Sequence, residues 1–376
     1  MKTLIAPLCT VAWLCLLNDA ACSQSILKDV FQVSGPACYF GQDSILEANG
    51  HTYFTAFESA SGIELWGSDG TKAGTLLVKD IFPGRGSSRP SFLTSVNGSL
   101  FFSADDGTRG IELWKTDGTE NGTVLVADLH PRGSSFPTAL INIDGQLFFS
   151  ANNGISGFEL WKSDGTREGT VLLKDINPGA ASSCPAELTN ANGMLFFSAD
   201  DGANGVELWK SDGTREGTEL VMPIRYEGSS FPSALTNVNG TLVFSALDEN
   251  NKRGLWKSDG TQGGTVLVKY ICPERNSLLS DFTPINGRLF FTVSHGGTTA
   301  LWQSNGEEPG TAPVHSVNNR ITTGLMSHLS AVGDLLYFVA TSNTRGQALW
   351  CTDGTGAGTF QVAGTGPGME TKRSLR

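Results

Sequence analysis

The chain has 376 residues, a formal net charge of -11 and a pI near 4.9. Its composition is 39% hydrophobic and 17% charged, which is typical of a folded protein and excludes a disordered polyelectrolyte. The acidic balance argues against nucleic acid and anionic lipid as partners, because phosphate binding requires a basic surface.

The amino terminus has the features of an export signal. Lys2 precedes an apolar run from Leu4 to Leu17, and small residues follow at 20–23. The run is too short for a comfortable membrane span, and no later segment is long and apolar enough for one. We therefore assign residues 1–22 to a signal peptide and expect a secreted, extracellular protein. A lipid anchor at Cys22 is the alternative.

Four cysteines remain after removal of this segment: Cys38, Cys184, Cys272 and Cys351. They allow three disulfide pairings, and their spacing selects none of them. No cysteine stands in a Cys/His spacing typical of zinc, so we expect no structural metal site.

A repeat of about 47 residues dominates the rest of the chain. Seven tryptophans recur at intervals of 46 to 48 residues, each after a short aromatic and apolar segment such as Met194–Ala199. They are Trp66, Trp114, Trp161, Trp209, Trp256, Trp302 and Trp350.

Each repeat predicts four strands separated by turns. In the fourth copy they are, in chain order, Ala186–Ala191, Met194–Ala199, Val206–Ser211 and Glu219–Ile224. The last strand has earlier equivalents at Val124–Leu129 and Val171–Ile176. Asn192-Gly193 fits a two-residue hairpin turn, and consecutive apolar residues within strands indicate sheets covered on both faces. Four antiparallel strands make a propeller blade, so we predict an all-β, seven-bladed β-propeller of four-stranded antiparallel blades. An open β-solenoid is the structural alternative.

We expect one propeller over residues 23–368 and a tail over 369–376. The repeats run over 26–75, 76–123, 124–170, 171–218, 219–265, 266–311 and 312–364. Ile26–Phe31 and Phe360–Gly364 both resemble the fourth strand, and the sequence does not select which of them completes the seventh blade.

The motif ELWxxDGT, present at Glu64–Thr71, Glu112–Thr119, Glu159–Thr166 and Glu207–Thr214, resembles the ELWxxDGT repeat family of secreted proteins. The order of elements is also similar to that of kelch-like propellers, although the kelch glycine pairs are absent. Both resemblances imply a propeller. Neither implies an activity or transfers catalytic residues.

The recurrent motifs are best interpreted as structural. Asp followed by Gly in DGT stabilises a hairpin through an Asx turn, whereas a calcium loop needs more oxygen donors than SDGT offers. We therefore expect no cofactor, and calcium is the one alternative. The tryptophans are expected to pack between blades. The glutamates Glu64, Glu112, Glu159 and Glu207 are expected to accept backbone or hydroxyl hydrogen bonds.

Function is expected where loops gather on one face. The loops between second and third strands are predicted to share that face with serine pairs of the linkers, such as Ser87-Ser88. The candidate ligand-binding residues are Asp105, Asp106, Asn152, Asn153, Asp200, Asp201, Asp248, Glu249 and His295.

No catalytic motif is present, so we assign no catalytic residue. The leading hypothesis is a secreted, non-enzymatic binding or scaffold protein that uses the loop face to bind an extracellular protein or glycan. One alternative is a multivalent lectin. The other is a channel-mouth enzyme such as a glycan hydrolase or lyase, whose asymmetric site would lie in the sixth and seventh repeats, near His295, His315, Arg320 and His328.

Overall fold

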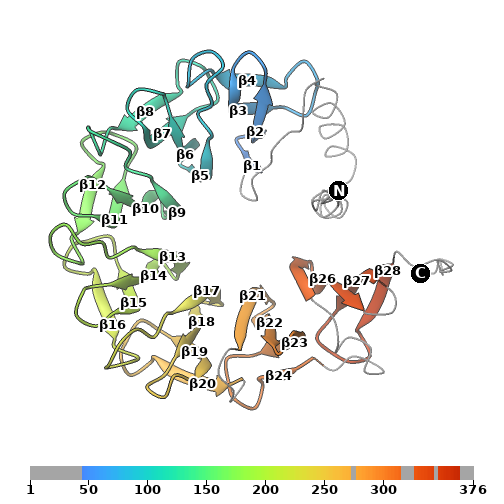
Figure 1. Ribbon diagram of the computed structural model, residues 1–376. Coiled ribbons are helices and arrows are strands. Elements are labelled where there is room, and N and C mark those ends of the chain that lie inside the picture. Colours follow the sequence, from blue (N-terminus) through green and yellow to red (C-terminus); the bar gives the residue numbers. More distant parts are fainter. Residues whose placement is uncertain (1–44, 272–276, 315–325, 343–345, 365–376) are drawn as a thin grey trace, which may run out of the picture. The chain divides into compact units, whose positions relative to one another are not determined.

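A computed structural model describes residues 45–271, 277–314, 326–342 and 346–364 (Figure 1). All regular elements among these residues are β-strands, which form seven four-stranded antiparallel sheets. In every sheet the strands follow chain order, so each sheet is an up-and-down meander. This confirms the predicted fold class, a seven-bladed β-propeller with four-stranded blades.

The chain divides into two compact units, Met1–Cys184 and Pro185–Arg376. The first unit holds blades 1 to 3. Its strands are β1 (Ile45–Ala48), β2 (His51–Glu58), β3 (Gly62–Ser68) and β4 (Leu76–Lys79) in blade 1; β5 (Ser91–Val96), β6 (Ser99–Asp105), β7 (Ile111–Thr116) and β8 (Val124–Ala127) in blade 2; and β9 (Thr138–Ile143), β10 (Gln146–Asn152), β11 (Phe158–Ser163) and β12 (Val171–Lys174) in blade 3.

The second unit holds blades 4 to 7. Its strands are β13 (Ala186–Ala191), β14 (Met194–Asp200), β15 (Val206–Ser211) and β16 (Glu219–Met222) in blade 4; β17 (Ser233–Val238), β18 (Thr241–Leu247), β19 (Arg253–Ser258) and β20 (Val266–Tyr270) in blade 5; β21 (Leu278–Ile285), β22 (Arg288–His295), β23 (Thr298–Ser304) and β24 (Ala312–Pro313) in blade 6; and β25 (Met326–Val332), β26 (Leu335–Ser342), β27 (Gly346–Thr352) and β28 (Phe360–Gly364) in blade 7.

The predicted bounds of the first and third strands of blade 4 are confirmed by β13 and β15, and β14 ends one residue later than predicted. The fourth strands, however, end two residues earlier, at Ala127 in β8, Lys174 in β12 and Met222 in β16. The physical reason is a change of hydrogen-bond partner. The backbone N–H of Ile224 donates to the Glu207 carboxylate at 3.0 Å, so it is no longer available to the sheet.

The fourth strand of blade 7 is β28, which pairs with β27. The carboxy-terminal candidate Phe360–Gly364 therefore fills this place. The other candidate, Ile26–Phe31, lies outside the described residues.

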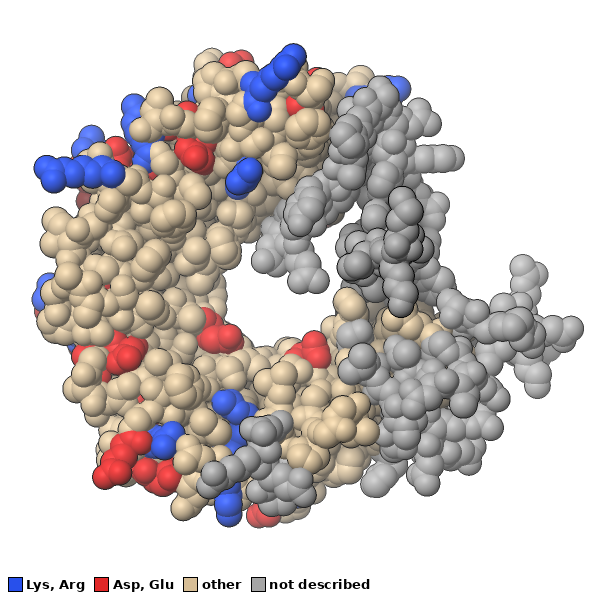
Figure 2. All heavy atoms as spheres, in the orientation of Figure 1, with Lys and Arg blue, Asp and Glu red and all other residues tan. Residues whose placement is uncertain are grey.

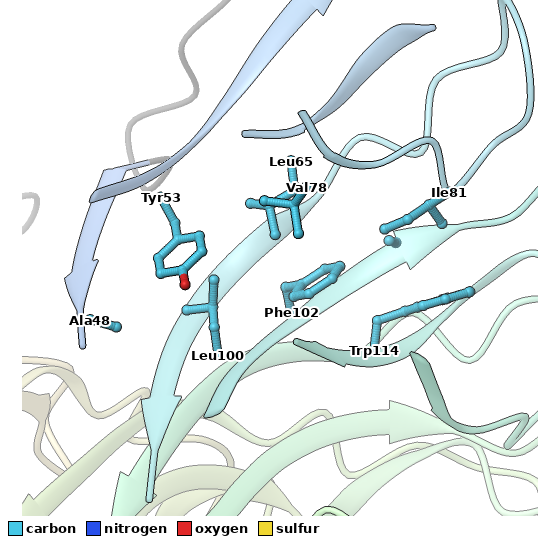
Figure 3. Packing of buried hydrophobic residues seen from close by; sticks show 9 residues of the cluster. Ala48, Tyr53, Leu65, Val78, Ile81, Leu100, Phe102 and Trp114 are labelled. Carbon is cyan, nitrogen blue, oxygen red and sulfur yellow. The ribbon is translucent and has the colours of Figure 1, made fainter. Parts of the chain in front are cut away.

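The core of each unit lies between consecutive blades. In Figure 3, Tyr53, Leu65 and Val78 of blade 1 face Phe102 and Trp114 of blade 2. The second strand of blades 2 to 7 carries a phenylalanine with no exposed surface: Phe102, Phe149, Phe197, Phe244, Phe291 and Phe338. Trp114, Trp161 and Trp209 are also buried, and Trp161 Nε1 donates to the Ala151 carbonyl at 3.0 Å. These indoles therefore pack in the interior and are not exposed to a ligand.

Truncation of one of these phenylalanines tests where the stability resides. We expect Phe149→Ala to lower the free energy of unfolding by about 3–5 kcal/mol, because it removes a completely buried ring and leaves a cavity. Ile155→Ala, at a side chain that is 76% exposed, is the control, with an expected change within about 0.5 kcal/mol. Denaturant unfolding measures both, and comparable losses for the two variants would contradict this account of the core.

Candidate functional site

The loops between second and third strands lie against the linkers that enter the same blade, as predicted. The Ser88 carbonyl of one linker accepts the Asp105 N–H at 3.0 Å, and the Ser135 carbonyl accepts the Asn152 N–H at 2.9 Å. In blade 5 the Ser230 carbonyl accepts the Leu247 N–H at 2.8 Å. Each loop is therefore fixed by backbone contact with its linker.

The nine candidate ligand-binding residues lie in five such loops, one for each of blades 2 to 6. Most of their polar atoms are engaged within their own loop. Asp106 accepts the backbone N–H groups of Thr108 and Arg109 and forms an ion pair with the Arg109 guanidinium at 2.6 Å. Although burial opposes ionisation, these hydrogen bonds lower the pKa of Asp106 to about 2. Asn153 and Asp201 accept equivalent backbone donors in their loops.

The remaining candidates in blades 2 to 5 are also hydrogen-bonded, either within their own loop or to a neighbouring segment. Asp105, Asn152 and Asp200 each accept the N–H of the glycine two residues later. Asp248 accepts the Tyr270 hydroxyl at 2.7 Å, and Glu249 accepts the Tyr226 N–H at 2.6 Å. These carboxylates and amides shape the loops, and their proposed role in binding a ligand stays a prediction.

The serine pairs of the linkers also have structural roles that the sequence did not reveal. The first serine of each pair accepts the N–H that begins the third strand, as Ser134 Oγ does from Ile111 at 2.9 Å. The second serine donates its hydroxyl to the glutamate of the ELW motif. Ser135 Oγ lies 2.5 Å from Glu112 Oε2.

Four glutamate–serine pairs of this kind occur: Glu64–Ser88, Glu112–Ser135, Glu159–Ser183 and Glu207–Ser230. Each glutamate has no exposed surface and accepts backbone N–H groups from the linker. The prediction that these acids accept hydrogen bonds is confirmed. Burial raises the pKa of Glu112 above its usual range, although its hydrogen bonds oppose the shift.

The DGT motif forms the Asx turn that was predicted. Asp117 Oδ1 accepts the N–H of Thr119 at 2.9 Å and its hydroxyl at 2.7 Å, and Thr119 Oγ1 accepts the Gly122 N–H. A Cβ on Gly122 would lie 2.0 Å from Asp117 Oδ1, which explains the glycine. No group of three or more His, Cys, Asp or Glu side chains able to hold a metal ion is found among the described residues.

Blade 6 departs from this arrangement at one serine. Ser277 corresponds to Ser230, but the glutamate that would receive its hydroxyl is replaced by Gly254 in blade 5. Ser277 Oγ lies instead 3.3 Å from Nδ1 of His295, at the end of β22. His295 was among the residues predicted from the sequence, whereas Ser277 was not. The loss of glutamate at position 254 was the signal that could have identified it.

The other histidines of the sixth and seventh repeats are not brought to this pair by any described contact. His328 lies in β25 in an exposed position, while His315 and Arg320 lie outside the described residues. Cys351 is a buried free thiol, and burial raises its pKa. Cys38 and Cys272 also lie outside the described residues.

Over the face visible in Figure 2, acidic and basic side chains are scattered among a larger neutral area. Within the described residues, no helix has the length and apolar character needed to cross a membrane.

No protein-family model matches the chain, and no curated protein matches it. Solved structures do. The chain is similar to a structure of prolyl endopeptidases, with a TM-score of 0.52 and 11% identity over 96% of this chain and 56% of the other. A puromycin-hydrolyzing peptidase of Mycobacterium tuberculosis has a TM-score of 0.50 and 11% identity, over 86% of this chain and 53% of the other. The β-propeller domain of the Trilobed protease from Pyrococcus furiosus has a TM-score of 0.45 and 12% identity, over 86% of this chain and 97% of the other.

The chain spans about half the length of the first two of these proteins, and at such identities the likeness is one of fold. The expected non-enzymatic binding or scaffold role was nevertheless wrong as the leading hypothesis. The two structures with TM-scores of 0.50 and above are those of peptidases, which are nearer to the enzymatic alternative than to a binding or scaffold role.

The buried glutamates predict a pH dependence of stability. Because the pKa of Glu112 is higher in the folded than in the unfolded chain, its stabilising contribution is complete at low pH and is lost as pH rises through the folded pKa. We therefore expect the wild type to gain stability relative to Glu112→Gln as pH falls from 7.5 towards 5. Urea unfolding at several pH values measures the difference. Glu168→Gln, at an exposed position of the DGT turn, is the control, and an equal slope for both variants would refute the assignment.

Proposed function

We propose that the chain is a hydrolase that cleaves an acyl bond, with Ser277 as the nucleophile and His295 as the general base. The observation that carries the proposal is the 3.3 Å separation of Ser277 Oγ and His295 Nδ1. A serine hydroxyl is a weak nucleophile until a neighbouring base accepts its proton, and this separation is near the range that such a transfer needs.

The internal repeats support a specialised role for this serine. Ser88, Ser135, Ser183 and Ser230 are at most 1% exposed and donate to a buried carboxylate. Ser277 is 7% exposed and faces an imidazole. In the other linkers the serine hydroxyl donates to a buried glutamate. Because Gly254 replaces that glutamate, the hydroxyl of Ser277 has the imidazole of His295 as its neighbour instead.

The similar structures support the reaction class, because they are those of prolyl endopeptidases and of a puromycin-hydrolyzing peptidase. Peptide-like substrates are accordingly proposed for this chain. Next to the pair, Leu278 is 57% exposed, and Phe231, at the equivalent position of the preceding blade, is 50% exposed. These side chains offer apolar surface on which a substrate side chain can pack.

In the proposed reaction, Ser277 Oγ attacks the acyl carbon while its proton passes to His295 Nδ1. His295 then returns the proton to the departing amine or alcohol, and an ester of Ser277 remains. Water attacks this ester with His295 again as the base, which releases the acid and restores the serine. Nδ1 must be unprotonated to act first, so the neutral ring carries its proton on Nε2.

Substitution of the pair tests the proposal. We expect Ser277→Ala and His295→Ala each to reduce kcat by about 10³-fold or more on a panel of fluorogenic aminoacyl and peptidyl amides and esters, because the nucleophile or its base is removed. A fluorophosphonate probe should label the wild type at Ser277 and leave Ser277→Ala unlabelled, as read by peptide mass spectrometry.

Ser230→Ala is the matched control, since it removes the equivalent serine of the preceding linker. It should lower stability by about 1.5–3 kcal/mol through loss of a hydrogen bond to a charged group, while kcat stays unchanged. Absence of turnover on the whole panel, or turnover that survives Ser277→Ala, would reject the hydrolase.

A further inference from the structure

The chain contains three Asn-Gly-Ser/Thr sequons, at Asn97, Asn121 and Asn239. Such a sequence permits N-glycosylation, but it identifies no site by itself. The three asparagines occupy two different structural positions. Asn97 and Asn239 lie in the hairpin turns between first and second strands, whereas Asn121 lies in the turn between β7 and β8.

The two hairpin asparagines have structural roles in their turns. Asn97 has φ 48° and Asn239 has φ 50°, left-handed values that asparagine tolerates better than most residues. The Asn97 amide donates to the Gly145 carbonyl of the next blade at 2.9 Å. Asn239 Nδ2 lies so close to the next blade that a Cβ on Gly287 would be 2.4 Å from it. A sugar on either amide nitrogen would replace one of its two hydrogens and would have to fit where that nitrogen approaches the next blade.

Asn121 has no such role. Its side chain is exposed, and its backbone is not among the left-handed non-glycine residues. The equivalent positions of the other six turns hold unrelated residues: Ala73, Glu168, Glu216, Gly263, Pro309 and Ala357. The fold therefore accepts almost any side chain here, and a glycan attached to Asn121 would extend into solvent.

The threonine hydroxyl of this sequon, in contrast, is buried and hydrogen-bonded once the turn has folded. Thr123 has no exposed surface, and its Oγ1 lies 2.7 Å from both Thr116 Oγ1 and the Thr119 carbonyl. An enzyme that must recognise the threonine can act only before this turn forms. Glycan transfer would thus precede folding, and the folded turn would accommodate the product.

From these contacts we propose that Asn121 is the N-glycan acceptor of the chain when it passes through a secretory pathway equipped for this modification. Asn121 Nδ2 forms a bond to the anomeric carbon of an oligosaccharide carried on a lipid pyrophosphate. The anomeric C–O bond breaks, the lipid pyrophosphate leaves, and the amide releases one proton. Chains modified at Asn97 or Asn239 do not complete their contacts between blades and are not recovered as folded product.

The test is secretion of the full chain from a eukaryotic cell line behind the host's cleavable leader. Glycosidase treatment in heavy-oxygen water then converts each glycosylated asparagine into a labelled aspartate, which peptide mass spectrometry locates. We expect the label at Asn121 and an intact mass that corresponds to one glycan. Asn121→Glu, which copies blades 3 and 4, should lose that mass and keep the same Tm as the deglycosylated wild type.

Asn97→Asp, which copies Asp144 at the equivalent turn of blade 3, is the control and should retain the glycan. Unmodified Asn121 in the secreted, folded protein would overturn the proposal, and so would a label found at Asn97 or Asn239. If the chain is not secreted, translation in the presence of microsomes with the same leader tests transfer at Asn121 alone, because transfer there does not require folding, and an unmodified Asn121 again overturns the proposal. Neither readout depends on Ser277 or on hydrolysis.

Discussion

Each blade has two apolar faces that it cannot bury alone. The phenylalanine in the middle of the second strand is buried only because another blade packs against it. Phe149 and Phe244 have no exposed surface because the neighbouring blade within the same unit covers them. Burial of this kind is the dominant favourable term in folding. It requires consecutive blades to keep a fixed distance and orientation, so the linkers between them must be fixed as well.

The glutamate–serine pairs meet that requirement. A carboxylate without exposed surface is costly unless it is hydrogen-bonded, and Glu112 receives donors from Leu129 and Ser135 as well as the serine hydroxyl. Through these bonds one side chain fixes both the end of the fourth strand and the path of the linker. The polar groups of the loop face are thereby largely committed to structure. The proposed hydrolase site accordingly lies where the repeat is broken, at the serine whose glutamate is replaced by Gly254.

Much of this architecture could be predicted from the sequence because it is repeated. Seven tryptophans at constant spacing fix the number of blades, and Asn-Gly and Asp-Gly pairs mark turns whose geometry depends only on neighbouring residues. The prediction failed where a contact joins distant residues. The fourth strands end early because of Glu159 and Glu207, and no local pattern carries that information. Likewise, nothing near Ser277 indicates that its partner is His295, eighteen residues later.

The glutamate–serine pair also bears on how such a chain can grow by duplication. Glu64 lies in β3, and Ser88 lies in the linker that leaves the same blade. A segment that runs from the first strand of a blade to the end of the linker after its fourth strand therefore contains both partners. A duplicated segment with these ends carries the buried carboxylate together with the groups that donate hydrogen bonds to it. A copy that starts at the fourth strand instead carries the serine of one pair and the glutamate of the next, so both depend on neighbouring repeats for their partners. A segment with the first pair of ends therefore keeps its buried charge matched whichever repeat precedes or follows it.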